Sequence, residues 1–258
     1  MTISIKDLCT GLEAGTAEVL QRATPATAEL LRWWFGRAPV QARAGLNFSP
    51  AQRRALLGVI VAHELGIGRA PPPGALTVPL RAGEGRVRVL LALLSWQLLN
   101  QHDAQASGVD DPRFTRHLMV VAPHPATHER LLVALCGQPL PGGHGARDFG
   151  ASDWVRMAEL LLPPHRRDTV WRLVCASVCS GTRIASHAAD EGVIAITGGR
   201  LDALECLARW PQLMVLDDDS GVRPARARGF SPCAWREQLH RMLATREGHG
   251  LHVVLAGR

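Results

Sequence analysis

The chain has 258 residues, of which 47% are hydrophobic and 20% charged, values that are typical of a folded protein and exclude a disordered one. Its formal net charge of +6 is compatible with a polyanionic partner. The longest apolar run, at 89–96, is far shorter than the ~20 residues that span a bilayer, and the N-terminus carries no apolar stretch of secretory length. We therefore expect a cytoplasmic protein without a membrane partner.

The N-terminal third has the apolar periodicity of helices, expected near 16–21, 27–35 and 50–66. Ser49-Pro50 is a good helix start, with serine as the cap and proline in the first turn. Three consecutive prolines within 68–74 then forbid a helix. We expect residues 1–70 to form a helical extension that packs, as one structural unit, on a core at 71–258.

Beyond the prolines, short apolar runs alternate with longer amphipathic segments. Strands are expected at 75–80, 117–122, 192–197, 212–216 and 251–256. Helices are expected at 87–101, 125–136, 152–161, 166–178, 200–208 and 234–245. This alternation predicts an α/β fold, a parallel sheet of five strands flanked by helices. The long connections at 101–114 and 137–150 are expected to be mobile surface loops.

The six cysteines include a single close pair, Cys175 and Cys179, in a segment with a helical pattern. A zinc site usually needs two such pairs, so we expect reduced, mostly buried thiols and no metal site. The aromatic run Trp33-Trp34-Phe35 is expected to pack the N-terminal helices onto the sheet rather than to stack on bases.

In a parallel α/β fold, ligands bind beyond the C-terminal ends of the strands. The first such segment reads LRAGEGRV at 80–87, a glycine turn where a phosphate loop belongs. The phosphate-loop motif ends in Gly-Lys-Ser/Thr, but here Arg86 and Val87 hold those places. An arginine fork does not replace a compact ammonium, and valine cannot ligate magnesium. Taken alone, the segment also fits an ordinary glycine turn.

Two further segments carry polar residues. The apolar run MVL at 214–216 is followed by three acidic residues, Asp217, Asp218 and Asp219. Asp218 holds the place of the glutamate that polarises the attacking water in motor ATPases. Gln52 lies one turn into the capped helix that precedes the glycine turn. Taken alone, the first fits an acidic turn and the second a surface glutamine.

In this order, the segments resemble the helicase subunits of type III restriction enzymes, which are DEAD/DEAH helicases of superfamily two. The resemblance covers about 28–258, and its ordered series is more specific than any one piece. The segments that carry it are LLRWWF (30–35), NFSPAQRRAL (47–56), RAGEGRVRVLLALLSWQLLN (81–100), LMVVAPHPATHERLL (118–132), ELLLPPHRRDTVWRLV (159–174), GVIAITGGRLDAL (192–204), LMVLDDDS (213–220) and LHVVLAGR (251–258).

The resemblance implies that the core is RecA-like, related to the P-loop NTPases, and corresponds to the first motor domain. It implies an adenine contact at Gln52, with Asp217 and Asp218 facing a metal. The implied phosphate-lining residues are Gly83, Glu84, Gly85, Arg86 and Val87. The segments 123–127 and 197–200, including Pro123, His124, Thr197 and Arg200, are implied to lie toward a nucleic-acid backbone.

A cluster of Arg223, Arg226 and Arg228 follows the acids and is a candidate for phosphate contacts, although a solvated basic surface is the alternative. The departures from the family pattern fall on the chemistry: the lysine and threonine are absent, Asp-Glu has become Asp-Asp, and the final Ser-Ala-Thr reads Leu-Ala-Gly. We therefore expect no intact catalytic residue and no active ATPase, with ATP and magnesium as cofactors only if a nucleotide is bound.

Three functions remain open at this point. The first is a degenerate helicase-like protein that binds DNA, another nucleic acid or a partner protein. The second is an ATP-binding helicase or translocase subunit whose second motor domain lies on another chain. The third is a purely structural subunit. Partners expected for a restriction or defence system are a second motor-domain, nuclease or methyltransferase subunit, and we expect no strand separation by this chain alone.

Overall fold

The structure is a computed structural model of the chain. It describes residues 5–36, 47–64, 76–80, 84–115, 117–122, 125–142, 146–180, 193–198, 212–218 and 251–256. Six of the described strands form one sheet in the order β1-β8-β7-β2-β6-β5, and every pair in it is parallel. Their bounds are β1 (Leu76–Pro79), β2 (His117–Ala122), β5 (Val178–Ser180), β6 (Val193–Gly198), β7 (Gln212–Asp218) and β8 (Leu251–Ala256).

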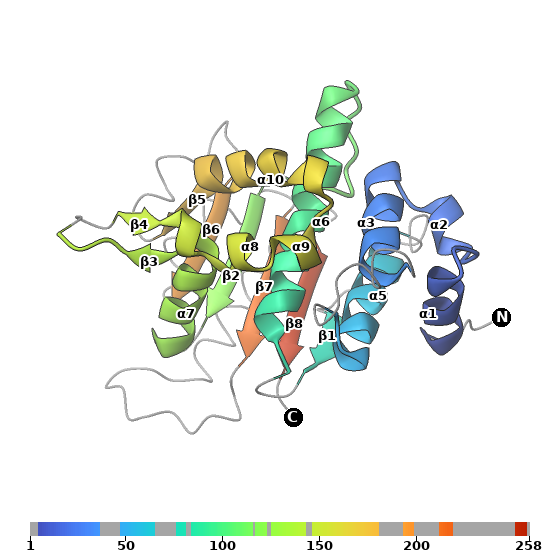
Figure 1. Cartoon of the computed structure of the whole chain (residues 1–258), viewed down its shortest axis with the longest axis horizontal. Helices are drawn as coiled ribbons and strands as arrows, with labels where there is room; N and C mark the ends of the chain where they lie inside the picture. Colours follow the sequence, from blue (N-terminus) through green and yellow to red (C-terminus); the bar gives the residue numbers. More distant parts are fainter. Residues whose placement is uncertain are drawn as a thin grey trace.

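The helices lie in front of the sheet and beside it (Figure 1). Before β1 come α1 (Ile5–Glu13), α2 (Val19–Arg22), α3 (Pro25–Phe35) and α5 (Pro50–Glu64). After it come α6 (Arg86–Ala106), α7 (Pro125–Cys136), α8 (Asp153–Arg156), α9 (Ala158–Leu161) and α10 (Pro164–Ser177). None of the helices that the structure describes is long and apolar enough to cross a bilayer.

The helix α6 is the centre of the packing. All of its residues from 89 to 100 are buried. A helix that is apolar on all sides belongs in the interior of a domain. It packs against α3 and α5 on one side and against α9 and α10 on the other (Figure 1). Trp34 and Phe35 of α3 are each only 1% exposed, as expected for a packing role, and Trp34 Nε1 donates to the carbonyl oxygen of Leu161 at 2.9 Å.

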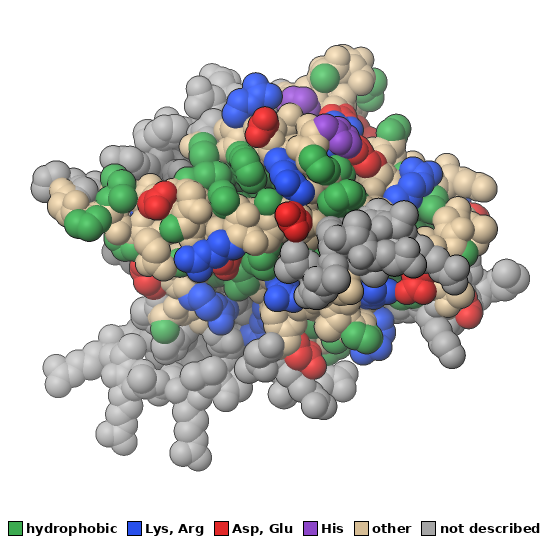
Figure 2. Space-filling model, in the orientation of Figure 1, with side chains coloured by type: hydrophobic (Ala, Val, Ile, Leu, Met, Phe, Trp, Pro, Cys, Tyr) green, Lys and Arg blue, Asp and Glu red, His purple; other side chains and the backbone are tan. Residues whose placement is uncertain are grey.

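A cluster of charged side chains ties α3, α6 and α10 at the surface. Arg166 of α10 donates from Nε to Glu29 of α3 at 3.0 Å and from Nη1 to Asp103 of α6 at 3.0 Å. His165 adds a 2.6 Å contact to Glu29. Figure 2 shows acidic, basic and histidine side chains gathered on this face, where α10 meets α3 and α6.

The C-terminal ends of the strands form one rim of the sheet. Pro79 of β1 and Asp218 of β7 both pair in register with Ala256 of β8. The glycine turn and the acidic segment therefore follow strands that end at the same rim. Between these two strands lies β8, which sets them about 10 Å apart.

Some elements differ from the expected pattern. The helix expected to continue through 178 ends at Ser177, and Val178–Ser180 form β5, an edge strand beside β6. This stretch is a short apolar run, whose periodicity does not distinguish the end of a helix from a strand. The helix expected at 152–161 is interrupted at Met157, whose φ of −106° and ψ of 16° leave the helical region. In addition, α1 was not expected, and the helix expected at 16–21 is the short α2.

Both connections expected to be irregular surface loops contain ordered structure. The helix α6 continues to Ala106, and Phe114 is buried against Trp96, with ring centroids 5.7 Å apart. In the second connection, β3 (Gln138–Pro139) pairs antiparallel with β4 (Arg147–Asp148), which is followed by the 3-10 helix η1 (Phe149–Ala151). Arg147 Nη1 donates to the carbonyl oxygen of Gly137 at 3.1 Å and fixes this hairpin.

Candidate functional site

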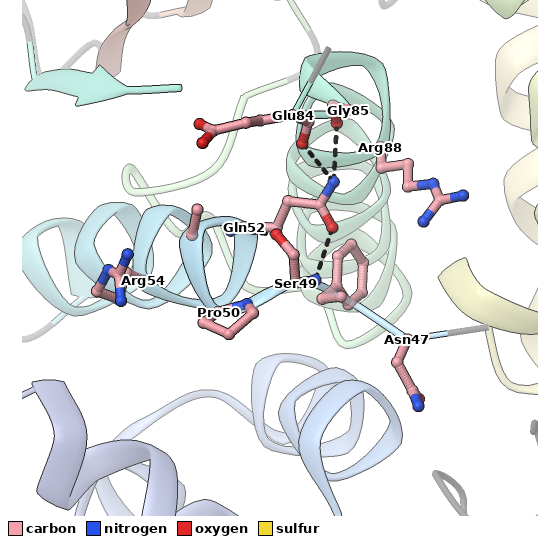
Figure 3. A pocket seen from close by; sticks show the side chains of 10 residues that line it. Asn47, Ser49, Pro50, Gln52, Arg54, Glu84, Gly85 and Arg88 are labelled. Carbon is pink, nitrogen blue, oxygen red and sulfur yellow. Dashed lines mark hydrogen bonds between the residues drawn. The ribbon is translucent and has the colours of Figure 1, made fainter. Parts of the chain in front are cut away.

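A pocket of about 740 Å³ opens where α5 and α6 begin (Figure 3). Its lining comes from two segments that are far apart in the sequence, the start of α5 and the turn that leads into α6. The lining residues are Asn47, Phe48, Ser49, Pro50, Ala51, Gln52, Arg54, Glu84, Gly85 and Arg88. The sequence-predicted residues Gln52, Glu84 and Gly85 are thus brought together in one place.

The start of α5 is fixed by a reciprocal pair of hydrogen bonds. Ser49 Oγ accepts from the backbone N–H of Gln52 at 3.3 Å, and Gln52 Oε1 accepts from the backbone N–H of Ser49 at 2.9 Å. This is a capping box, in which the Ser-x-x-Gln spacing satisfies two backbone donors that the first turn of a helix leaves unpaired. The cap also sets the direction in which the Gln52 side chain leaves the helix.

Gln52 joins α5 to the glycine turn. Its Nε2 donates to the carbonyl oxygens of Glu84 at 2.6 Å and Gly85 at 3.3 Å, and the residue is only 3% exposed (Figure 3). An amide group has two N–H donors, and both are engaged by the turn. Gln52 therefore holds the turn in place and has no N–H left to donate to a ligand.

Gly85 is the residue that allows this approach. It caps α6 with φ 74° and ψ 45°, the left-handed region in which glycine carries no steric penalty. A Cβ atom at this position would lie 2.3 Å from Gln52 Nε2. The glycine of the turn is thus explained by its left-handed conformation and by the contact with Gln52, whether or not a phosphate binds there.

Arg86, which holds the place of the phosphate-loop lysine, is buried and bonded to the backbone. It is 6% exposed, and its Nε donates to the carbonyl oxygen of Leu80, the residue that follows β1, at 3.0 Å. Val87 is half-buried and packs against the apolar core. Neither residue lines the pocket. Arg86 therefore connects the two ends of the turn, because it follows the turn and bonds the backbone of Leu80, which precedes the turn.

Arg54 and Arg88 line the pocket and were not anticipated as site residues. Among the residues that the structure describes, neither guanidinium has a hydrogen-bond or ion-pair partner. Both lie near helix N-termini, where the helix dipole disfavours a cation and favours an anion. Arginine near the start of two neighbouring helices was the signal available in the sequence. Together with Glu84, these residues give the pocket two cationic side chains and one acidic side chain.

The remaining predicted residues are only partly placed. Asp217 and Asp218 end β7, and Thr197 lies in β6 in register with Val121 of β2. Thr127, within the segment implied to face nucleic acid, is buried with 4% exposure and cannot present its side chain at the surface. The predictions for Gly83, Pro123, His124, Arg200, Asp219, Arg223, Arg226 and Arg228 lie outside the described residues.

The described part of the chain contains no group of three or more His, Cys, Asp or Glu side chains placed to hold a metal ion. The expectation of mostly buried cysteines is wrong for Cys175, which is exposed, because it lies on the outer face of α10. Cys9 and Cys136 are half-buried. Burial raises the pKa of the Cys9 thiol above its ordinary value, which keeps it in the protonated, poorly nucleophilic form.

Comparison of the chain with protein-family models, with curated proteins and with solved structures found no significant match. The function proposed below therefore depends on the chemistry of the residues described above and on the sequence resemblance.

Proposed function

We propose that the chain is a non-hydrolysing, helicase-like module with a RecA-like core, which binds nucleic acid or a partner protein as part of a restriction or defence system in the cytoplasm. The observation that carries this proposal is that the motif side chains form hydrogen bonds with the backbone of the protein. Gln52 donates both N–H groups to the carbonyl oxygens of Glu84 and Gly85, and Arg86 donates to the carbonyl oxygen of Leu80.

The residues present do not fit magnesium-ATP chemistry. Val87 has no oxygen with which to ligate magnesium, and the Arg86 side chain is buried and does not line the pocket. Removing a single group of such a catalytic set commonly reduces the rate by about 1000-fold. We therefore derive no hydrolytic step for this site.

The sheet supports the RecA-like part of the proposal. Three of the segments that resemble helicase motifs follow β1, β7 and β8, which end at the same rim. The strand order also reverses between β7 and β2, since the chain leaves β2 toward β5 and leaves β7 in the opposite direction, toward β8. Such a reversal is where open α/β sheets place their ligands.

The test measures nucleotide and nucleic-acid binding separately. We expect a fluorescent ATP analogue with magnesium to bind weakly or not at all and to show no turnover. We expect single- or double-stranded DNA to shift in a gel, with an affinity that falls as salt rises. Micromolar ATP affinity with turnover would contradict the proposal, and absence of DNA binding at low salt would leave only the partner-binding form of it.

A second candidate is a working ATP-binding subunit completed by a motor domain on another chain. The observation that favours it is the pocket itself, which is large enough for a small ligand and carries Arg54 and Arg88 without partners among the described residues. The double variant Arg86→Lys with Val87→Thr restores the motif side chains. If the wild type already binds ATP as tightly as this variant does, the second candidate is favoured.

A further inference from the structure

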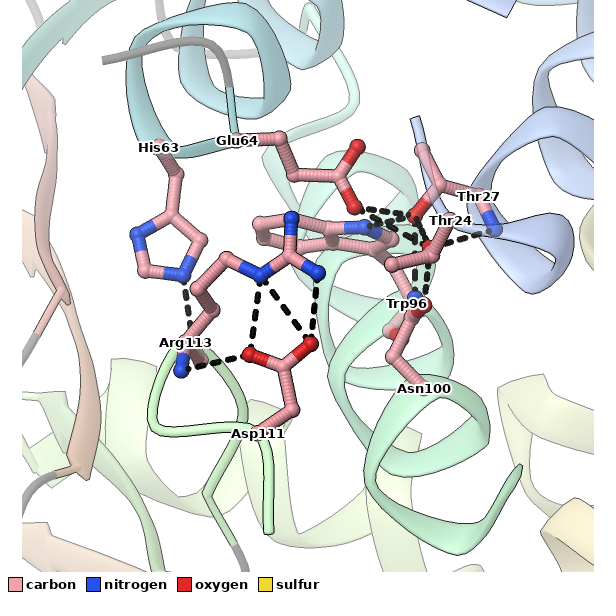
Figure 4. Close-up of polar contacts among 8 residues, drawn as sticks. All are labelled: Thr24, Thr27, His63, Glu64, Trp96, Asn100, Asp111 and Arg113. Carbon is pink, nitrogen blue, oxygen red and sulfur yellow. Dashed lines mark hydrogen bonds and ion pairs between the residues drawn. The ribbon is translucent and has the colours of Figure 1, made fainter. Parts of the chain in front are cut away.

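Glu64, the last residue of α5, lies among buried polar side chains of three helices (Figure 4). It is 4% exposed. Its Oε1 atom is 2.8 Å from Thr27 Oγ1 in α3 and 3.1 Å from Oγ1 of Thr24, the N-cap of α3. Trp96 and Asn100 of α6 complete the group, which we call the Glu64 cluster. It lies outside the pocket and is independent of the proposed function.

The orientation of the Asn100 amide is fixed by its surroundings. Nδ2 donates to the carbonyl oxygen of Trp96 at 2.8 Å and to Thr27 Oγ1 at 3.0 Å. Exchanging Oδ1 and Nδ2 would place an acceptor against the Trp96 carbonyl oxygen, which has no proton to offer. Asn100 Oδ1 therefore faces Thr24 Oγ1 and must accept a proton there.

Counting protons indicates that an ionised Glu64 does not fit the cluster. Thr27 Oγ1 accepts from Trp96 Nε1 at 2.8 Å and from Asn100 Nδ2, so it uses both lone pairs and is left with one proton. Thr24 Oγ1 contacts Thr27 Oγ1, Glu64 Oε1 and Asn100 Oδ1 but also has one proton. With a carboxylate, the Thr24 proton cannot serve both Asn100 and Glu64, and two acceptors would face each other.

A protonated Glu64 removes the conflict at the contact between Thr24 and Glu64. Thr24 then donates to Asn100 Oδ1, Thr27 donates to Glu64 Oε1, and the carboxylic proton is donated to Thr24 Oγ1. Only the contact between Thr24 Oγ1 and Thr27 Oγ1 is left without a proton, whereas a carboxylate would leave two such contacts. The second carboxyl oxygen, Oε2, is buried and has no hydrogen-bond partner among the described residues. A neutral acid tolerates this far better than a carboxylate, because a buried charge without partners is costly.

Among the residues that the structure describes, the charged and titratable groups around the cluster do not neutralise a carboxylate. Arg113 is engaged by Asp111, with Nε 2.8 Å from Oδ1 and Nη2 2.6 Å from Oδ2. His63 of α5 is half-buried beside Trp96, and desolvation holds its pKa below the ordinary value, so it is uncharged near neutral pH. The side chains that face Glu64 from α3 and α6 are uncharged. Burial raises the pKa of Glu64, against weaker opposing effects of the Thr27 and Thr24 hydrogen bonds and of Arg113.

We infer that Glu64 is held as a neutral carboxylic acid whose proton is donated to Thr24 at the junction of α3, α5 and α6, so that raising the pH ionises it and loosens this junction. For an acid stabilised in its protonated form, the contribution to stability is fully present below the ordinary value near 4.5 and is lost as pH rises through the higher value of the folded state. Because α5 and α6 also begin at the pocket, the junction supports both helices that form it.

The experiment compares urea unfolding of the wild type and Glu64→Gln from pH 5 to pH 9. Glutamine keeps an N–H donor in place of the carboxylic proton and carries no charge at any pH. We expect the wild-type unfolding constant to rise with pH, by about tenfold for each pH unit between the two Glu64 pKa values. We expect Glu64→Gln to lack this component and to exceed the wild type in stability at the alkaline end. Glu18→Gln, at an exposed position, is the matched control and should follow the wild type.

A second measurement needs no variant. The side-chain carboxyl carbon of Glu64, followed by NMR in uniformly labelled wild-type protein, should report a carboxyl group that stays protonated above pH 4.5. The Trp96 indole N–H signal should shift together with it, because that group donates to Thr27 in the same cluster. Titration of Glu64 near 4.5, or a Glu64→Gln deficit that is equal at every pH, would overturn the inference.

Discussion

At the scale of single residues, the contact between Gln52 and Gly85 decides the shape of the pocket. The amide of Gln52 reaches the backbone of the turn only because position 85 has no side chain. The same glycine adopts φ 74°, a conformation that other residues rarely adopt. One residue thus satisfies a backbone requirement and a packing requirement together.

Gly85→Ala should destabilise the protein by about 1–3 kcal/mol, because it combines backbone strain with a clash against the Gln52 amide. The measurement is the free energy of unfolding in urea. The matched control is Gly58→Ala on the exposed face of α5, where a Cβ atom meets nothing within 4 Å. That change should stabilise the protein by about 0.5–1 kcal/mol, because alanine favours a helix interior. Equal effects of the two substitutions would refute the role given to Gly85.

The sequence identified Gln52 and Gly85 but not the way in which they act. The capping pattern Ser-x-x-Gln and the glycine turn were visible, whereas the hydrogen bonds between them span 33 positions of the chain and depend on tertiary packing. For the same reason, the burial of Arg86 against the Leu80 carbonyl oxygen was not predictable from its place in the motif. Sequence order located the site, but packing determined which side chains face the pocket.

At the scale of elements, the boundaries that the sequence predicted best are those with a local signal. The strand β2 and the helix α7 have the bounds expected, since an apolar run ends at Ala122 and proline begins the following helix. The strand β5 was missed because it is defined by its pairing with β6, and its own sequence carries no pattern that indicates a strand. The hairpin strands β3 and β4 were missed because two-residue strands carry too little pattern to detect.

The contacts of Arg166 are the clearest test of how the helices are held together. Arg166→Ala should destabilise the protein by about 1–2 kcal/mol, because it removes charge-assisted bonds to Glu29 and Asp103 on two other helices. The loss should shrink in 1 M salt, where exposed charges are screened. Arg22→Ala is the control. Among the described residues, Arg22 pairs only with Glu18, both side chains are more than half exposed, and such pairs contribute little. Thermal unfolding at two salt concentrations measures both effects, and a loss no larger than that of the control would count against the role of Arg166.

At the scale of the whole molecule, a continuous apolar core joins the N-terminal helices to the sheet. It includes Leu12 of α1, Leu31 of α3, Leu57 of α5, Leu94 of α6 and Val120 of β2. No separate core is evident for the N-terminal helices within the described residues, so their packing and that of the sheet depend on each other.

This continuity predicts that the N-terminal helices and the sheet unfold together. Far-UV circular dichroism reports on all helices, whereas tryptophan fluorescence reports on buried side chains such as Trp34, Trp96 and Trp154. Both signals should follow one urea transition with the same midpoint. An earlier transition that exposes Trp34 but leaves Trp154 buried would show that the N-terminal helices open independently.

The position of β8 in the sheet has a consequence for the order in which the protein is built. It is the last of the described strands to be synthesised, yet it lies between β1 and β7. While the ribosome is still making residues 251–256, both of those strands lack the neighbour that satisfies their backbone groups. Pairings across such sequence distances form slowly, so the nascent chain exposes unpaired edges of β1 and β7 until residues 251–256 emerge.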